Sequence, residues 1–195
     1  MKAIFLFFSL LVFCFWEVEG QVPDLPLSFT NEEVRRFKES VEPYCLSYYE
    51  EEIESFEKNE ILDLSINGLG QKLKVNILQK GSKISVEGGS LFFYKIESPS
   101  SQDLKLNFSD FYLNTHSYLY IYNDFYYNSN RIFTDINTIR KNIILLNCLN
   151  NNDVFHFNIV KKHPFFGNRL IIEFFEPHKT IQSSELVIGG IVRLR

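Results

Sequence analysis

The side chains that could carry out acid–base catalysis are few. A nucleophilic triad needs a Ser or Cys that is activated by a base, and the base in turn is oriented by a carboxylate. The candidate bases are His116, His156, His163 and His178. None of them lies in a recognisable catalytic signature, and the chain has no Gly-x-Ser-x-Gly or Gly-Asp-Ser-Gly element to present a serine to an oxyanion hole. We therefore predict no catalytic residue and expect the chain not to be an enzyme.

Carboxylates and metal ligands give no stronger signal. Glu173 and Glu176 are close together at the end of an apolar run, as the acids of a glycosidase must be in space. Three positions apart on a strand, however, they point to opposite faces, so Glu173 is interpreted as an outward polar residue. The acidic run 50–57 lacks the pattern of a calcium loop, and no Cys or His lies near another at ligand spacing. No metal site and no cofactor are predicted.

Tyrosines alternate with aliphatic residues in one short segment. Tyr118, Tyr120 and Tyr122 share one face if this segment is a β-strand. Two interpretations are open: the rings could form a platform that binds a glycan or a protein surface, or they could be the packed face of a sheet. The packed face is favoured, because sandwich cores routinely use aromatic residues. These tyrosines are the candidate binding residues.

The first residues are typical of a secretory signal. Lys2 supplies the positive charge, Ala3 to Trp16 form the apolar core, and Val18 and Gly20 suit a cleavage site. The apolar run is shorter than the ~20 residues of a spanning helix, so a retained membrane anchor is disfavoured. Residues 1–20 are predicted to be a signal peptide, and the mature chain is expected to be secreted, either periplasmic or extracellular, without membrane attachment.

Cleavage would leave two cysteines, Cys45 and Cys148. In an oxidising compartment they could form a disulfide, and closing a loop of this length would stabilise the fold by about 4 to 5 kcal/mol. Cys148 also follows an apolar strand pattern, where a buried thiol is equally compatible. Both interpretations remain open.

Composition and charge favour one principal globular domain. The 195 residues are 45% hydrophobic and 16% aromatic, which argues against disorder. The formal net charge is −4 and the basic residues are scattered, so there is no basic patch for nucleic acid. A nucleic-acid partner is not expected.

A short helical extension precedes the main domain over residues 21–60. Thr30 and Glu33 resemble a capping box and predict a helix that ends before Pro43. A second helix is predicted over Leu46 to Phe56.

From residue 61 to 195, short apolar runs recur between Gly, Asn, Ser and Asp. The predicted strands are Ile61–Ile66, Leu73–Leu78, Lys83–Val86, Leu91–Glu97, Leu104–Phe108, Tyr118–Tyr122, Arg131–Thr134, Asn142–Leu146, Val154–Val160, Leu170–Phe175 and Leu186–Leu194. Many strands with almost no helix between them predict an all-β fold, an antiparallel, jelly-roll-like β-sandwich. Asp103 to Asn123 is predicted to be the partner of the last two strands.

Several segments resemble those of a known protein family, and they follow one another along the chain in the same order. They are Phe93–Pro99, Leu104–Leu113, Tyr118–Asn123, Leu170–Pro177 and Leu186–Val192. Their order and spacing resemble the N-terminal domain that precedes the peptidase domain in secreted lysyl endopeptidase-like serine proteases of Bacteroidetes. The match covers Ile61 to Arg195. It departs from the family at Phe92 to Tyr94, where a Trp is usual, and the catalytic domain is missing, so no catalytic residue is carried over.

The resemblance implies a non-catalytic β-sandwich that acts as a pro-region or accessory domain of a trypsin-like serine endopeptidase. Its partner would be the peptidase domain or another secreted protein. The alternative is a stand-alone secreted module that uses the tyrosine face to bind a glycan or a protein. A hydrolase built on the same sandwich is the third and weakest hypothesis, for want of a paired nucleophile and base.

Overall fold

The computed structural model describes residues 23, 25–46, 68–99, 103–123, 143–147, 165–166, 168–180 and 182–194. Several predictions concern other parts of the chain: the signal segment 1–20, the second helix beyond Leu46, the strands Ile61–Ile66, Arg131–Thr134 and Val154–Val160, and the residues Cys148, His156 and His163. These lie outside the described residues. No helix in the described ranges is long and apolar enough to cross a membrane.

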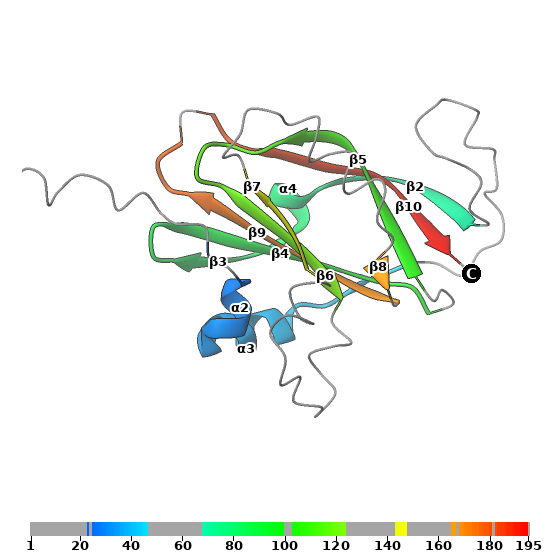
Figure 1. Cartoon of the computed structure of the whole chain (residues 1–195), viewed down its shortest axis with the longest axis horizontal. Helices are drawn as coiled ribbons and strands as arrows, with labels where there is room; N and C mark the ends of the chain where they lie inside the picture. Colours follow the sequence, from blue (N-terminus) through cyan, green and yellow to red (C-terminus); the bar gives the residue numbers. More distant parts are fainter. Residues whose placement is uncertain are drawn as a thin grey trace, which may run out of the picture.

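Two β-sheets face each other, and two helices cover the outer side of one of them (Figure 1). In the described part of the chain, sheet A consists of β1 (Tyr44–Cys45), β4 (Gly89–Glu97), β9 (Arg169–Pro177), β6 (Tyr118–Asn123) and β7 (Ile143–Asn147) in that order, with β3 (Ser82–Val86) also paired to β4. Sheet B has the order β2 (Gly68–Asn76), β10 (Glu185–Leu194), β5 (Asp103–Tyr112) and β8 (Phe165–Phe166). The helices are α2 (Leu27–Thr30), α3 (Glu32–Ser40) and α4 (Ile77–Lys80). The predicted all-β sandwich is confirmed.

The predicted partnership of the last two strands is confirmed as well. β9 pairs with β6 in sheet A, and β10 pairs with β5 in sheet B, both antiparallel. The connections from β5 to β6 and from β9 to β10 therefore both pass from sheet to sheet. β1 is the exception to the antiparallel pattern, since it runs parallel to β4.

A partly buried polar contact ties these two connections together. The Ser184 N–H donates to Glu176 Oε1 at 2.9 Å, and the hydroxyls of Ser184 and Ser117 donate to Glu176 Oε2 at 2.6 and 2.8 Å. The Asn114 N–H donates to Ser184 Oγ at 2.9 Å. Charge-assisted hydrogen bonds of this kind are stronger than neutral ones. Glu176 therefore fixes the end of the sandwich at which both connections pass from one sheet to the other.

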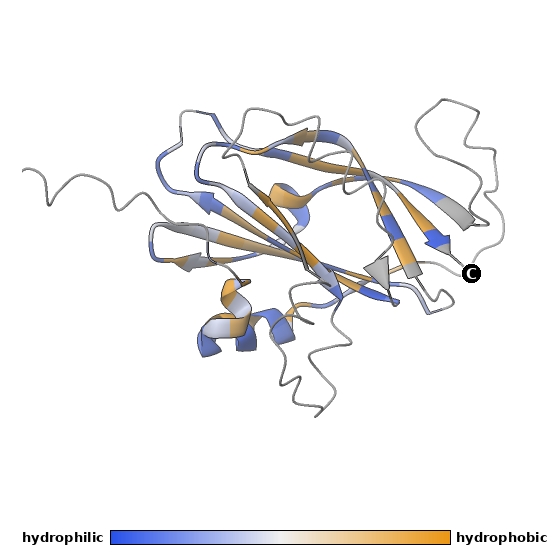
Figure 2. Cartoon of the chain, in the orientation of Figure 1, coloured by the Kyte–Doolittle hydropathy of each residue, from blue (hydrophilic) through white to orange (hydrophobic). Residues whose placement is uncertain are grey.

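The core lies between the sheets because side chains of a strand alternate between its faces. Figure 2 shows the corresponding change of hydropathy along the strands. In β9, Leu170, Ile172 and Phe174 point into the sandwich and are at most 1% exposed. Ile171, Glu173 and Phe175 point to the opposite face, toward the helices. Sheet A is thus covered on both sides along β9.

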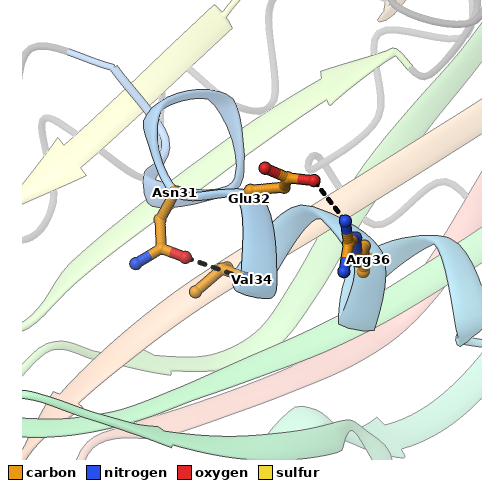
Figure 3. A network of polar contacts seen from close by, with 4 residues as sticks. All are labelled: Asn31, Glu32, Val34 and Arg36. Atoms are coloured by element: carbon orange, nitrogen blue, oxygen red, sulfur yellow. Dashed lines mark hydrogen bonds and ion pairs between the residues drawn. The ribbon is translucent and has the colours of Figure 1, made fainter.

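Two differences from the predicted element boundaries have a cause in capping side chains. The cap of α3 is Asn31, whose side chain accepts a hydrogen bond from the Val34 N–H at 3.1 Å (Figure 3), and not Thr30. Thr30 belongs to α2, where its hydroxyl donates to the Leu27 carbonyl. An exposed ion pair between Glu32 and Arg36 adds about 0.3–0.5 kcal/mol along the helix.

The strand predicted over Leu73–Leu78 ends at Asn76. The Asn76 side chain accepts hydrogen bonds from the N–H groups of Leu78 and Gln79, which starts the short helix α4. A side chain that caps a helix in this way stops a strand, because it offers the backbone a competing partner.

Gly89 gives a test of the contact between β4 and β9. A Cβ at Gly89 would lie 2.4 Å from the Glu176 carbonyl oxygen and 2.6 Å from the Phe175 ring. We expect Gly89→Ala to lower the free energy of unfolding by about 1–3 kcal/mol, as overpacked sites do, in urea denaturation.

Gly88 provides the matched control, because it has φ +78° and a Cβ at this position would meet nothing within 4 Å. Asn tolerates this backbone region, so Gly88→Asn should cost less than about 1 kcal/mol. Equal losses for the two variants would contradict the steric explanation.

Candidate functional site

The predicted tyrosines lie together on the outer face of sheet A. Tyr118, Tyr120 and Tyr122 are 7%, 0% and 1% exposed, and they share one face as their spacing predicts. We call this surface the tyrosine face. Helices α2 and α3 lie over it (Figure 1), so the rings form a packed layer, and an open platform would require these helices to move away.

The helices form an apolar layer on the tyrosine face, and we call residues 27–41 the N-terminal cap. The cap contributes Leu27, Phe29, Val34, Phe37 and Val41 to a cluster with the tyrosines, Leu91, Phe93 and Ile171. The Phe29 ring meets the Tyr122 ring edge-on, with centroids 5.1 Å apart. Aromatic pairs of this geometry add about 0.5–1.5 kcal/mol to the burial of their surface.

A fully buried carboxylate lies beneath the cap. Glu173 is 0% exposed, although it was predicted to be an outward polar residue. The Glu173 side chain points away from the sandwich core and opposite to Glu176, as predicted. The prediction that it contacts solvent is wrong, because the cap covers this face.

Two residues bind the Glu173 carboxylate directly, and we call the three residues together the Glu173 clasp. The Ser28 N–H donates to Oε1 at 3.2 Å, and the Ser28 hydroxyl donates to Oε2 at 2.6 Å. The Tyr122 hydroxyl donates to the same Oε2 at 2.9 Å and lies 3.0 Å from Ser28 Oγ. The clasp therefore joins α2 to β6 and β9.

A buried lysine from α3 also lies in this layer. Lys38 is 1% exposed, and its Nζ lies 5.7 Å from the centroid of the Phe29 ring and 5.9 Å from that of Tyr122. A cation over an aromatic face is stabilised by the ring quadrupole, more strongly where water is excluded. Burial raises the pKa of Glu173 above its usual 4.5, while the hydrogen bonds from Ser28 and Tyr122 and the charge of Lys38 act in the opposite direction.

The other two tyrosine hydroxyls differ in their surroundings. The Tyr120 hydroxyl donates to the Pro23 carbonyl, which extends the contact of the N-terminal segment beyond α2. Tyr118 stacks on Phe175, with ring centroids 4.8 Å apart. Burial, together with the nearby Glu173, raises the pKa of Tyr118. The Tyr118 hydroxyl therefore stays protonated at neutral pH.

A pocket of about 260 Å³ opens where the cap ends. It lies between Glu39–Pro43 and the strands β4 and β9. Arg169 and Glu97 form an ion pair in its wall, with Nη2 and Oε1 2.9 Å apart. The wall also carries Glu39, Glu42 and Lys95, so its charges are mixed and favour neither an anion nor a cation.

The remaining predicted residues do not join this site. Cys45 is exposed on β1, and Cys148, with which a disulfide was one of two interpretations, lies outside the described residues. His116 and His178 are exposed in connecting segments. In the described ranges, no group of three or more His, Cys, Asp or Glu could hold a metal ion.

Sequence reasoning missed Ser28 and Lys38 and misjudged Glu173. A signal for Lys38 was present: with Val34 four positions before it and Val41 three after, it lies on the apolar stripe of a helix. Glu173 is likewise a charged residue inside the apolar run Leu170–Phe175. Two opposite charges, each interrupting an apolar pattern, indicate a buried polar contact between the elements that carry them.

Comparison with known protein families, curated proteins and solved structures gives no match for this chain. The geometry of the tyrosine face and its cap is therefore the basis for assigning a function.

The Tyr122 hydroxyl provides a direct test of the clasp. Tyr122→Phe removes one donor to a fully buried carboxylate, so we expect a loss of about 1–3 kcal/mol in the free energy of unfolding, measured by chemical denaturation. Tyr44, which is 39% exposed, is the control. Tyr44→Phe should change stability by no more than about 0.5 kcal/mol. Equal effects of the two changes would mean that the hydroxyl of Tyr122 does not support the carboxylate.

Proposed function

We propose that this chain is a secreted, non-catalytic protein-binding domain that serves as a pro-region or accessory domain of a trypsin-like serine endopeptidase. The resemblance of Phe93–Pro99, Leu104–Leu113 and the later strand segments to the N-terminal domain of lysyl endopeptidase-like proteases supports the association with a peptidase. The signal-like residues 1–20 support secretion.

One observation carries the protein-binding part of the proposal: the tyrosine face already holds a peptide segment. The cap binds as an amphipathic helix does, with Val34, Phe37 and Val41 directed into an aromatic and aliphatic surface. Laying an amphipathic helix on an apolar surface is a recurring mode of peptide recognition. A face that accommodates residues 27–41 of its own chain has the chemistry to accommodate a similar segment of a partner.

The clasp gives this surface selectivity as well as affinity. A segment that replaces the cap must satisfy Glu173, because a buried carboxylate left without its donors is costly. Ser28 supplies a backbone N–H and a hydroxyl to it. A partner segment would therefore need a serine or threonine ahead of the helix whose apolar residues pack on Tyr120 and Phe93, as Ser28 in α2 precedes α3.

A stand-alone module would use the same face. Its protein-binding form differs from the main proposal only in the identity of the partner. Glycan binding requires sugar rings to stack on exposed aromatic faces, and Tyr118, Tyr120 and Tyr122 are buried under the cap. A protein partner also requires the cap to move, but the face already packs against the apolar side chains of a peptide segment, which favours a protein over a glycan.

The proposal is tested with the mature chain and a trypsin-like peptidase domain encoded by the same genome, mixed and titrated by calorimetry. We expect a stable complex. Val34 of the cap is 2% exposed and does not belong to the sheet. Val34→Asp should detach the cap and so tighten binding of the peptidase domain. If about one wild-type molecule in ten is open and the variant is fully open, the affinity rises about tenfold.

Lys74→Ala, at an exposed position of β2 in sheet B, is the control and should leave the affinity unchanged. Absence of a complex for both the wild type and Val34→Asp would overturn the association with the peptidase. Binding that Val34→Asp leaves unchanged would place the partner on another surface.

A further inference from the structure

We propose that the Glu173 clasp is a pH-sensitive latch: the N-terminal cap is held on the tyrosine face while Glu173 carries a proton, and it loosens as rising pH ionises the carboxyl group. The latch is a property of the chain alone. Its use in controlling the access of a partner to the tyrosine face rests on the proposed function.

The first argument is a count of hydrogens in the clasp. Ser28 Oγ, Tyr122 Oη and Glu173 Oε2 form a triangle with sides of 2.6, 2.9 and 3.0 Å. When Glu173 is ionised, two hydroxyl hydrogens serve three oxygen–oxygen contacts, so one contact has no hydrogen. One added proton gives three hydrogens for three contacts, and each oxygen can then donate to the next around the ring. The geometry accommodates the neutral acid without leaving a group unsatisfied.

The second argument is the environment of the carboxyl group. Glu173 is 0% exposed, between Ile171 and Phe175 on its own strand and under the apolar side chains of the cap. Burial away from water disfavours the charged form of a carboxyl group, and here burial is the largest influence on its pKa, which is raised. In the open form, water would solvate the carboxylate, and its pKa would return toward the usual value.

The charged and titratable groups around Glu173 come from several elements. Helix α2 carries no charged residue, and α3 directs Lys38 toward the site. On the same face, β6 supplies Tyr118, Tyr120 and Tyr122, and β4 supplies Lys95, which lines the pocket at the end of the cap. The Lys38 charge favours ionised Glu173 and so opposes the latch. Its effect is smaller than that of burial.

The direction of the pH effect follows from proton linkage. Because the pKa is raised in the closed form, the closed form binds more protons than the open form, and closure weakens as pH rises. The contribution of Glu173 to closure is complete below 4.5, the usual carboxyl value, and is lost as pH passes through the raised pKa of the closed form.

Hydrogen exchange of the purified mature chain, followed by mass spectrometry at pH 5 and pH 8, tests the latch. After correction for intrinsic exchange rates, the amides of residues 27–40 should be less protected at pH 8 than at pH 5. The protection factor should change by up to tenfold, or about 1.4 kcal/mol, for each unit by which the Glu173 pKa differs between the closed and open forms. Peptides from β5 and β10 in sheet B are the internal reference and should not change in parallel.

Glu173→Gln is the decisive variant, because an amide can fill the triangle but does not titrate. We expect its cap to be equally protected at both pH values. The latch is overturned if the wild-type cap shows no pH dependence, or if Glu173→Gln retains it. Should Glu173→Gln fail to fold, a ¹³C NMR titration of the wild-type Glu173 carboxyl replaces it, and a midpoint at or below the usual 4.5 overturns the latch.

A second measurement separates the latch from the proposed function. The peptidase domain is titrated into the wild type at both pH values, and binding should be tighter at pH 8. Cap protection that depends on pH, without any complex, would retain the latch and reject the peptidase association. A complex whose affinity is the same at both pH values, together with a pH-dependent cap, would show that the partner binds elsewhere.

Discussion

A carboxyl group that has no access to water needs hydrogen-bond partners from the protein, and Glu173 is such a group at the centre of sheet A. Its donors come from two distant parts of the chain, Ser28 in α2 and Tyr122 in β6. Because the donors are specific, the cap can lie on the tyrosine face in one position only, whereas apolar contacts alone would tolerate sliding. Buried polar contacts of this kind favour a unique arrangement more than they add to stability.

Strand β9 carries two carboxylates that are bound in the same way on its opposite faces. Each takes a serine N–H on one oxygen and two hydroxyls on the other: Ser28 and Tyr122 for Glu173, Ser184 and Ser117 for Glu176. Their settings differ, since Glu176 is partly exposed at the end of the sandwich and Glu173 is wholly enclosed. Glu176 therefore secures the connections between the sheets, and Glu173 holds the cap on the tyrosine face.

The sequence predicts the sandwich well where a single physical rule decides. Strict alternation in Tyr118–Tyr122 and the apolar run Leu170–Phe175 were sufficient to locate β6 and β9 and to put the tyrosines on one face. The cap over that face was not predicted, because alternation tells which residues share a face but not what covers it. The α3 boundary was missed by one residue, since Thr30 and Asn31 are both good caps and only the course of the backbone decides between them.

The separation of the clasp residues along the chain has a consequence for biosynthesis. Ser28 must pair with Glu173, 145 positions later, and with Tyr122, 94 positions later. The cap is synthesised well before Tyr122 and Glu173, so it cannot dock until they have followed, and contacts this distant form slowly. Until these residues have been synthesised, the apolar side of α3 therefore remains exposed, and this segment is where chaperones would be needed most.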